Sequence, residues 1–320
     1  MDRTDMLRFG IIGLNEGNGH PYSFSAIFNG YDESALAECP FAAIRAYLPA
    51  IHQNRHIIPD ARVTHVWTQD DELSQRVARV ARIPHVAHDS IDMLGEVDGL
   101  ILARDDPHNH WAMARPFLEA GVPVYLDKVL ADTMEDYRRI LAAVGEHGLL
   151  MAGSPSRFTP AVRKAKLEID PDSVRSVHGI SCVNWIRYGN HLLDGIAALF
   201  GADFKTVQNI GEDGCDVVRL VYRNGLNVVL EAIEGVALPI EFACYQKSGG
   251  THIRVPFADE GDGFASYFRG FYNMLEAFTQ MVKTGQRPAW HEQTLAVSRA
   301  VIGGELSRQR GGIKIELDSI

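Results

Sequence analysis

Short apolar runs separated by stretches of helical periodicity dominate the first half of the chain. The runs are of strand length and cover residues 7–12, 63–67, 98–103, 124–126 and 149–152. Helical spacing follows two of them, at Trp111–Ala120 and, after a capping-box start at Thr133, up to about Glu146. Repeated strand–helix alternation predicts a parallel sheet with right-handed crossovers. We therefore expect residues 1–155 to form a Rossmann-like, doubly wound α/β domain.

Past residue 155 the pattern changes to strands and turns. Strand-like segments cover residues 177–183, 217–222, 226–232, 241–246 and 252–255. Arg223-Asn224-Gly225 predicts a hairpin turn between two of them. Two helices follow, one from Phe268 to Gly285 and one from about Glu292 to Arg308. Residues 156–320 therefore predict an α+β substrate and oligomerisation domain with a largely antiparallel sheet.

Residues 21–60 are longer than one crossover helix requires. We expect an insertion there, with a short helix around residues 41–48. His52 and His56 are four residues apart in it, but no third ligand follows, so this spacing favours surface or packing histidines. We expect no metal site.

The first apolar run leads into a glycine-rich loop, residues 13–20. A dinucleotide fingerprint G-x-G-x-x-G that starts at Gly13 requires glycine at two positions that are Asn15 and Asn18 here. Asparagine tolerates left-handed backbone, and Gly17 keeps the loop glycine-rich. A longer pyrophosphate turn therefore stays open beside an ordinary glycine turn, with Gly13, Asn15 and Gly17 as candidate cofactor residues.

The run at residues 124–127 delivers Asp127 and Lys128 to the carboxyl end of a strand. Open parallel sheets bind ligands at such strand ends. A lysine there can hydrogen-bond a substrate oxygen and stabilise the negative charge that develops on it. An exposed lysine at the end of an ordinary strand is the alternative.

Several motifs in residues 95–165 have the spacing of one known family. Asp127-Lys128-Val129 stands where the family reads Glu-Lys-Pro, and residues 105–110, which end in His110, lead to Leu118-Glu119-Ala120-Gly121. Gly153, Ser156, Arg157, Phe158 and Pro160 follow at matching positions. The chain thus resembles the glucose-fructose oxidoreductase and inositol dehydrogenase family, often called Gfo/Idh/MocA.

The resemblance implies that the first domain binds NAD, with NADP as the alternative. It places Asp106, His110 and Asp127 near the cofactor, and it aligns Thr68 with the acid that holds the ribose hydroxyls in the family. Asp70 is displaced by two positions. Two aspartates, with no cation directly after them, would repel a 2′-phosphate, so NAD is favoured.

The resemblance also implies a catalytic pair, Lys128 and His191, with Asp194 three residues after the histidine. Relatives carry an aspartate four residues before the histidine, where this chain has Arg187. Arg187 either faces the cleft, where it suits an anionic substrate group, or pairs with a surface acid. Further candidate substrate-binding residues are Arg157, Tyr188, Asn190 and Asp194.

The resemblance favours an NAD(P)-dependent oxidoreductase that transfers a hydride between the nicotinamide and a sugar, inositol or related polyol. Two alternatives remain. One is a glycosidase-like or lyase-like member that retains its NAD and oxidises a sugar transiently. The other is a non-catalytic dinucleotide or sugar sensor, which the departures at Asn15, Asn18, Thr68 and Arg187 would suit.

Composition restricts the partners. The net charge of −10 and the pI near 5.7 argue against binding to nucleic acid or an anionic membrane. We expect no transmembrane segment and no signal peptide, and the four scattered cysteines are typical of free thiols in a reducing cytoplasm. The family resemblance implies a homodimer or homotetramer.

Overall fold

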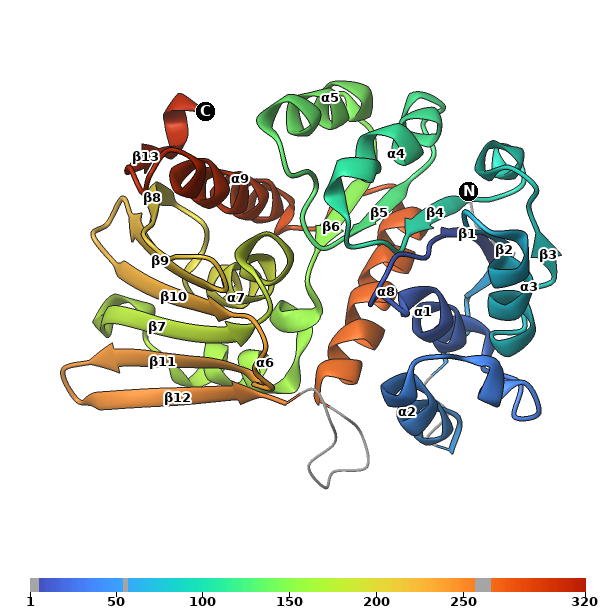
Figure 1. The fold of residues 1–320 in the computed structure, drawn as a ribbon, viewed down its shortest axis with the longest axis horizontal. Helices are drawn as coiled ribbons and strands as arrows, with labels where there is room; N and C mark the ends of the chain where they lie inside the picture. The colour runs from blue at the N-terminus through green and yellow to red at the C-terminus, as the bar shows by residue number, and fades with distance from the viewer. Residues whose placement is uncertain (1–5, 54–56, 257–265) are drawn as a thin grey trace.

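The computed structural model describes residues 6–53, 57–256 and 266–320. The first half of the chain forms a six-stranded sheet in which all paired strands are parallel (Figure 1). Its order is β3-β2-β1-β4-β5-β6, the order of a doubly wound sheet. The strands are β1 Leu7–Ile12, β2 Ala61–Trp67, β3 His85–Val86, β4 Gly99–Leu102, β5 Val124–Asp127 and β6 Leu150–Gly153. The predicted fold class of this half is confirmed.

Helices cover both faces of this sheet because its strands are apolar on both sides. One face packs under α4 and α5 through Leu100, Leu102, Phe117 and Ile140. The other packs on α1 and α8, where the Phe9 ring lies 5.4 Å from Phe28 and 5.2 Å from Phe278. The helices are α1 His20–Asn29, α2 Ala42–Gln53, α3 Asp71–Val80, α4 His110–Glu119, α5 Met134–Val144 and α8 Ser266–Thr284.

The second half forms a seven-stranded sheet of order β12-β11-β7-β10-β9-β8-β13. Only the pair of β7 and β10 is parallel among its described pairings, so the prediction of a largely antiparallel sheet is confirmed. The strands are β7 Val174–Cys182, β8 Phe204–Asn209, β9 Cys215–Tyr222, β10 Asn227–Ile233, β11 Ile240–Gln246, β12 Gly249–Val255 and β13 Ile315–Glu316.

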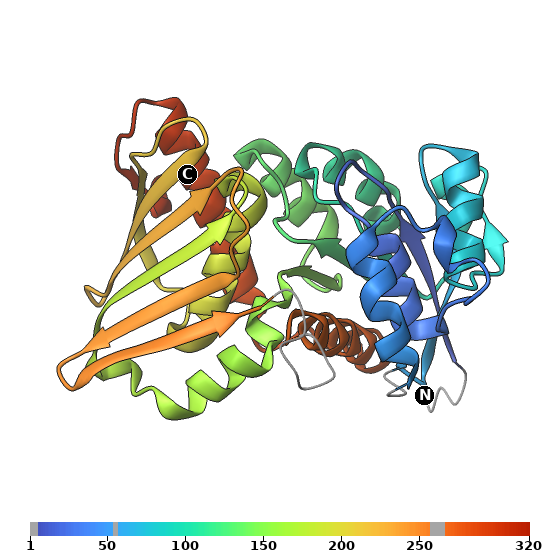
Figure 2. The same cartoon turned by 60° about the horizontal axis from the view of Figure 1, so that its bottom comes forward.

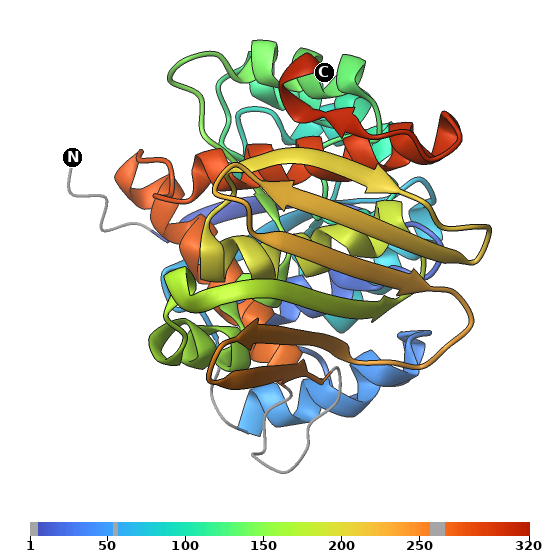
Figure 3. The ribbon, with the colours of Figure 1, turned by 90° about the vertical axis from the view of Figure 1, so that its left-hand side faces the viewer.

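Three helices pack on one face of this second sheet: α6 Pro160–Glu168, α7 Trp185–Phe200 and α9 His291–Gln309. The described part of the chain leaves the other face without a helix, and that face is turned outward in Figures 2 and 3. α8 lies between the two sheets and packs on the first, although it comes late in the sequence (Figure 1). Its apolar side chains therefore connect the two halves of the chain.

Short 3-10 helices occupy several of the connections. They are η1 Leu36–Glu38, η2 Ser90–Met93, η3 Pro107–Asn109, η4 Pro155–Phe158, η5 Pro171–Ser173 and η6 Leu317–Ser319. Residues 21–29, the start of the expected insertion, belong to α1, the ordinary crossover helix after β1. The extra chain begins after Asn29 and contains α2, which starts next to the predicted helix start at Phe41. His56 is outside the described residues, and of His52 only the helical backbone is described.

Other features bear on the class of protein. The four cysteines are free thiols, with Cys39 and Cys244 buried. None of the helices in the described ranges combines the length and the apolar character that a membrane crossing requires. Within the same ranges no group of three or more His, Cys, Asp or Glu side chains is arranged to hold a metal ion.

Candidate active site

Lys128 occupies a strained backbone position directly after β5. Its φ is +69°, in the left-handed region that side-chain-bearing residues rarely adopt, at a cost of about 1–3 kcal/mol. Two backbone hydrogen bonds hold it there: Lys128 N–H donates to the Gly153 carbonyl at 3.2 Å, and Gly153 N–H donates back at 3.0 Å. The sheet thus holds the lysine at the carboxyl edge, in a conformation that needs support from its neighbours.

The ammonium group of Lys128 lies in a buried polar cluster around Asp105, a residue of the loop after β4. Lys128 Nζ donates to Asp105 Oδ2 at 2.6 Å, and Arg187 Nη2 of α7 donates to the same oxygen at 2.8 Å. Asn15 Nδ2 donates to Asp105 Oδ1 at 2.6 Å, while Asn15 Oδ1 accepts from the Asp105 N–H at 3.1 Å. These four residues, Asn15, Asp105, Lys128 and Arg187, are the Asp105 cluster.

Asp105 and Lys128 both stay charged although their side chains are buried. Burial acts to raise the pKa of Asp105, but the Lys128 charge and the hydrogen bonds from Asn15, Lys128 and Arg187 outweigh it and hold that pKa far below its usual range. Burial acts to lower the pKa of Lys128, but the Asp105 and Asp127 carboxylates outweigh it and raise that pKa. Lys128 is therefore a fixed cation at neutral pH.

His191 is a residue of α7, lies near Lys128 and is 2% exposed. Burial, followed by the nearby charges of Lys128 and His20, holds its pKa well below the usual value, so the imidazole is neutral at physiological pH. Its Nδ1 lies 2.6 Å from Ser154 Oγ, whose own hydroxyl donates to Ser156 Oγ at 3.0 Å. That chain makes Nδ1 the protonated nitrogen and leaves Nε2 as the basic one.

The ring of Tyr188 is close to both Lys128 and His191. Its ring centroid is 5.9 Å from Lys128 Nζ and 4.7 Å from the His191 ring. Burial raises the pKa of Tyr188, so the phenol stays protonated. The structure thus brings Lys128, which follows β5, next to Tyr188 and near His191 of α7, although β5 and α7 are far apart in the chain.

Asp194 is buried and pairs with Arg157, which lines a cleft on the other side together with Trp290 and Gln293, away from the Asp105 cluster. Arg157 Nε donates to Asp194 Oδ1 at 2.8 Å, and the Ser154 N–H donates to Asp194 Oδ2 at 2.8 Å. The Arg157 guanidinium also stacks over the Trp290 ring at 5.7 Å. Both carboxylate oxygens are thus occupied by the protein, so this pair supports Ser154 and His191. The prediction that the two residues contact substrate is corrected to a supporting role.

Asn190 is a polar residue of the site whose side chain is unsatisfied at both ends. It is 1% exposed, and among the described residues neither its amide nitrogen nor its amide oxygen has a hydrogen-bond partner. An unpaired buried amide costs about 1–3 kcal/mol, so such groups usually have a partner outside the chain's own atoms. Asn190 sits directly before His191, which keeps it a candidate for substrate contact.

A cleft of about 590 Å³ opens beside the Asp105 cluster. It lies where the chain passes from β1 to α1 and from β4 to α4, the point at which strand order reverses in the first sheet. Its lining includes Asn15, Gly17, Asp105, Asp106 and Arg187. Arg187 therefore reaches the cleft and pairs with a buried acid there, rather than with a surface acid.

Glycine is required at the start of the loop that borders this cleft. A Cβ on Gly13 would lie 2.2 Å from Pro21 in the first turn of α1. A Cβ on Gly19 would lie 2.4 Å from Ile44 of α2, so that glycine allows the extra helix to pack closely. Gly17 has a φ of +78° and faces the cleft. Gly13 and Gly17 thus shape the turn, while Gly19 serves helix packing.

Asp106 is held by Arg104 under the same loop. Arg104 Nε donates to Asp106 Oδ1 at 2.8 Å, and Arg104 Nη1 donates to the Leu14 carbonyl at 2.9 Å and to Gln69 Oε1 at 3.1 Å. The side chain of Arg104 therefore links the glycine-rich loop to the ends of β2 and β4. Asp106 still lines the cleft, as expected of a cofactor residue.

Three other predicted cofactor residues are hydrogen-bonded to other groups of the chain. The Thr68 hydroxyl is bonded to Ser74 Oγ at 2.9 Å and to the Asp70 carbonyl at 2.7 Å. His110 is fully buried, and its two ring nitrogens each lie 3.0 Å from a backbone carbonyl, those of Leu130 and Arg104. The geometry corrects the expectation of direct contact for both residues: Thr68 shapes the start of α3, and His110 ties together the loops after β4 and β5.

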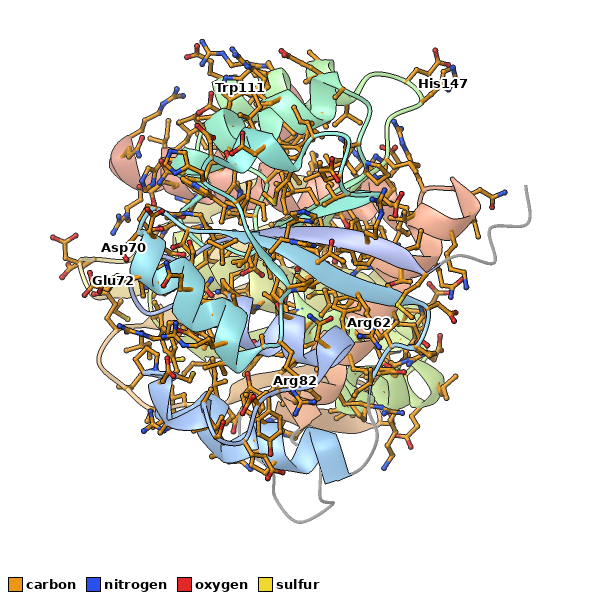
Figure 4. The ribbon with its side chains drawn as sticks, turned by 90° about the vertical axis from the view of Figure 1, so that its right-hand side faces the viewer. Arg62, Asp70, Glu72, Arg82, Trp111 and His147 are labelled. Atoms are coloured by element: carbon orange, nitrogen blue, oxygen red, sulfur yellow. The ribbon has the colours of Figure 1, made fainter. Side chains whose placement is uncertain are left out.

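Asp127 is the third of these residues and is also fully buried. Its Oδ2 lies 2.5 Å from His20 Nδ1 and accepts from Asn18 Nδ2 at 3.2 Å. The carboxylate therefore links β5 to the start of α1, and the expectation of direct cofactor contact is corrected to support of the loop. Asp70 caps α3 and is exposed on the outer side of the first sheet (Figure 4).

Asp105, His20 and Ser154 are site residues that the sequence reasoning did not single out. A signal for Asp105 was present: two acids follow a buried strand, and the neighbouring strand ends in Lys128. The carboxyl ends of adjacent parallel strands meet at one edge, so an acid and a lysine there are neighbours. His20 and Ser154 gave no such signal, because their partners come from distant segments.

Residues 42–154 match a family model for the Gfo/Idh/MocA proteins, described as an oxidoreductase family with an NAD-binding Rossmann fold. The chain is also similar to inositol 2-dehydrogenase 1 of Saccharopolyspora erythraea, with 35% identity over 132 residues. That match covers 40% of this chain and 39% of the relative, so the chain spans about two fifths of the relative's length in the alignment.

Solved structures of low identity share the fold over nearly the whole chain. Myo-inositol 2-dehydrogenase of Lactobacillus plantarum is 14% identical, with a TM-score of 0.76 over 98% of this chain and 99% of its own. Scyllo-inositol dehydrogenase of Lactobacillus casei, solved with NAD(H) and scyllo-inositol, is 14% identical, with a TM-score of 0.75 over 98% of this chain and all of its own. Both halves of the chain are therefore arranged as in these proteins.

Proposed function

We propose an activity for this chain, which belongs to the Gfo/Idh/MocA oxidoreductase family: NAD-dependent oxidation of a CH–OH group in a polyol of the inositol or sugar class. The observation that carries the proposal is the placement of Lys128 and His191 around one ring, that of Tyr188, at 5.9 and 4.7 Å from its centroid. The lysine is held as a cation there and the imidazole as a neutral group. One group can hold the substrate oxygen while the other accepts its proton.

The cleft beside the Asp105 cluster fits NAD. It lies at the switch point of the sheet, and Gly17 brings backbone to its wall without a side chain. Bound NAD supplies the hydride acceptor for the reaction. Asp70, Asp71 and Glu72 at the start of α3 would repel a 2′-phosphate, which favours NAD over NADP. Gly13, Asn15, Gly17 and Asp106 are the proposed cofactor-binding residues.

The chain's own groups have separate tasks in the proposed reaction. Lys128 donates a hydrogen bond to the reacting oxygen and stabilises the negative charge on it as the C–H bond breaks. His191 Nε2 accepts the hydroxyl proton, with the ring fixed by Ser154 at Nδ1. Tyr188 excludes water from the space between them. The Asn190 amide offers N–H donors and a carbonyl acceptor to the other hydroxyl groups of a polyol.

The test is to purify the full chain, identify any retained dinucleotide by mass spectrometry, and follow NADH absorbance with a panel of inositols, sugars and sugar acids. NADH formed in proportion to oxidised polyol is the expected result. Two outcomes would contradict the proposal. Release of a leaving group from a glycoside without net NADH would favour the NAD-retaining hydrolase or lyase. Saturable ligand binding without any turnover would favour the sensor.

Replacing Gly13 with valine should weaken NAD binding at least about tenfold, or about 1.4 kcal/mol. Any Cβ at this position collides with Pro21, and a branched side chain must displace the first turn of α1 from the loop. Calorimetry or fluorescence with NAD measures the affinity, and circular dichroism checks that the variant is folded. A Gly250→Ala variant is the control, because a Cβ there would meet its nearest neighbour, the Tyr245 ring, at an ordinary contact distance of 3.4 Å. Unchanged affinity in a folded Gly13→Val protein would remove this loop from the cofactor site.

We also propose that the protein is a homodimer or homotetramer formed through the outward face of the second sheet. Figure 3 shows this face toward the viewer, formed by the strands of the second sheet. It carries a hollow lined by residues of β7, β10, β11 and β12. Charges of both signs stand on it, Glu231 and the intrachain ion pair of Glu241 with Arg254, so the same patch on a second copy can meet it with opposite charges. Light scattering of the wild-type chain and of an Arg254→Glu variant tests the assembly: loss of the oligomer in the variant supports it, and a monomeric wild type contradicts it.

A further inference from the structure

We propose that Asp105 is the positioning acid of this site: it fixes the place and charge of the Lys128 ammonium, and Asn15 and Arg187 hold it in position. The proposal rests on the function proposed above in its assignment of Lys128 to the reacting oxygen. It adds a residue outside the predicted catalytic pair and gives a role to two residues that depart from the family pattern.

Both carboxylate oxygens of Asp105 accept hydrogen bonds from these groups. Oδ1 accepts from Asn15, and Oδ2 accepts from both Lys128 and Arg187, at 2.6 and 2.8 Å. The side chain of Asp105 is 2% exposed. Two cations that share one oxygen would repel each other strongly without the carboxylate between them, because burial weakens screening by water. Asp105 is therefore needed for the two cations to coexist.

Asp127 cannot take over this task, although it is the other carboxylate near Lys128. Its Oδ2 is bonded to Asn18 of the glycine-rich loop and to His20, the first residue of α1. Lys128 Nζ donates to Asp105, and Asp127 acts on it only through space. The remaining charged or titratable groups that face Lys128 come from α7: Arg187, Tyr188 and His191. None of them is an anion at neutral pH.

Asn15 and Arg187 converge on this one carboxylate from different elements. Asn15 stands where the dinucleotide fingerprint has glycine, and its amide makes a two-point contact with the side chain and backbone of Asp105. Arg187 stands where the resembled family has an acid, and it reaches across from α7. The acid partner of the lysine is thus delivered by the loop after β4. The same contact fixes α7, which carries His191, relative to β5, which leads into Lys128.

The first test is Asp105→Asn, with Asp105→Glu as the conservative variant. Asparagine keeps the shape of the side chain but removes its negative charge, so we expect kcat to fall at least about tenfold. We call the fall of kcat/KM at high pH, where Lys128 loses its proton, the alkaline limb; it should move down by about one pH unit or more. Asp105→Glu should restore the alkaline limb even where kcat stays low, because the charge is restored and the geometry is not. A purely structural role would lower kcat at every pH without moving the limb, and that result would overturn the proposal.

Asp216→Asn is the matched control. Asp216 is also a buried aspartate and accepts from the Trp185 N–H at the start of α7, but it lies outside the Asp105 cluster. Its loss should change the melting temperature and leave the alkaline limb in place. A limb that moves equally in both variants would mean that general loosening of α7, rather than the Asp105 charge, sets the pH dependence.

A second readout needs no turnover, so that failure of the proposed function and failure of this inference are distinguishable. The chain has seven lysines, few enough for ¹³C-labelled lysine NMR, and Lys128→Ala identifies the Lys128 resonance. In the wild type the Lys128 resonance should show a protonated amine up to a higher pH than the resonances of the exposed lysines do. In Asp105→Asn its titration midpoint should fall by about one unit or more. An unmoved midpoint would overturn the inference, even if the protein proves to be an active dehydrogenase.

Discussion

Lys128→Ala should lower turnover by roughly 10² or more while leaving NAD affinity nearly intact. The ammonium is the fixed cation of the site, and in the proposed reaction its charge is used at the substrate oxygen rather than at the cofactor. The remaining partners of Asp105, Arg187 and Asn15, still satisfy the buried carboxylate in the variant, so the fold should survive. Steady-state kinetics on the best polyol, with NAD titration by fluorescence, measures both quantities.

Lys164→Ala is the control for this experiment. Lys164 is an exposed lysine of α6, and its loss should leave kcat and NAD affinity unchanged. Lys128→Met, which fills the space of the side chain without its charge, should resemble Lys128→Ala. If Lys128→Met retained full turnover, the cation would have no part in the chemistry. If both variants lost NAD binding, the lysine would serve the cofactor.

The fold could be predicted from sequence where local pattern and final environment agree. β1 coincides with the apolar run at residues 7–12, because a strand buried on both faces reads as a continuous apolar segment. Thr133 caps α5 through the Asp136 N–H as its capping motif indicates. β8 and α6 were missed, since β8 mixes polar and apolar residues and α6 is short and largely polar. Their positions are set by packing against distant elements.

The site was predictable as a set of elements but not as a set of contacts. Lys128 was indicated by its place at the end of an apolar strand, and His191 by the family resemblance, through its spacing to Asp194. Contacts that join the loop after β4 to α7 have no local signature, so Asp105 was not recognised as the partner of Lys128 and Arg187. Arg157 and Asp194 were interpreted as substrate residues because sequence gives no sign that two charged side chains neutralise each other in the interior.

Arg187 shows why an isolated departure from a motif is hard to interpret. Taken alone, an arginine in place of an acid suggests either an anionic substrate or a surface ion pair. In the structure the departure is compensated within the same site, since Asp105 supplies the negative charge. A sugar acid remains in the substrate panel because Arg187 lines the cleft, but its guanidinium is already bonded to a carboxylate of the protein.

His191→Asn should lower kcat for polyol oxidation by roughly 10² to 10³, a typical loss for a general base. Asparagine keeps a polar group near Ser154 but cannot accept the substrate proton at neutral pH. In the proposed reaction the neutral imidazole is the active form. The pKa of His191 is held well below 6.5 by burial and by the charges of Lys128 and His20. The acid limb of kcat/KM should therefore lie well below pH 6.5 in the wild type and be absent in the variant.

Stability gives a second check on the same group, and its sign follows from the lowered pKa. Below pH 6.5 the unfolded chain protonates this histidine while the folded chain does not, so its contribution to the free energy of unfolding falls as pH falls, by up to about 1.4 kcal/mol per pH unit. The melting temperature of His191→Asn should thus drop less than that of the wild type between pH 7 and pH 5. His147→Asn is the control, because that side chain lies on the surface (Figure 4). An acid limb near pH 6.5 with equal thermal pH dependence in all three proteins would show that His191 titrates as an ordinary exposed histidine and is not the buried base.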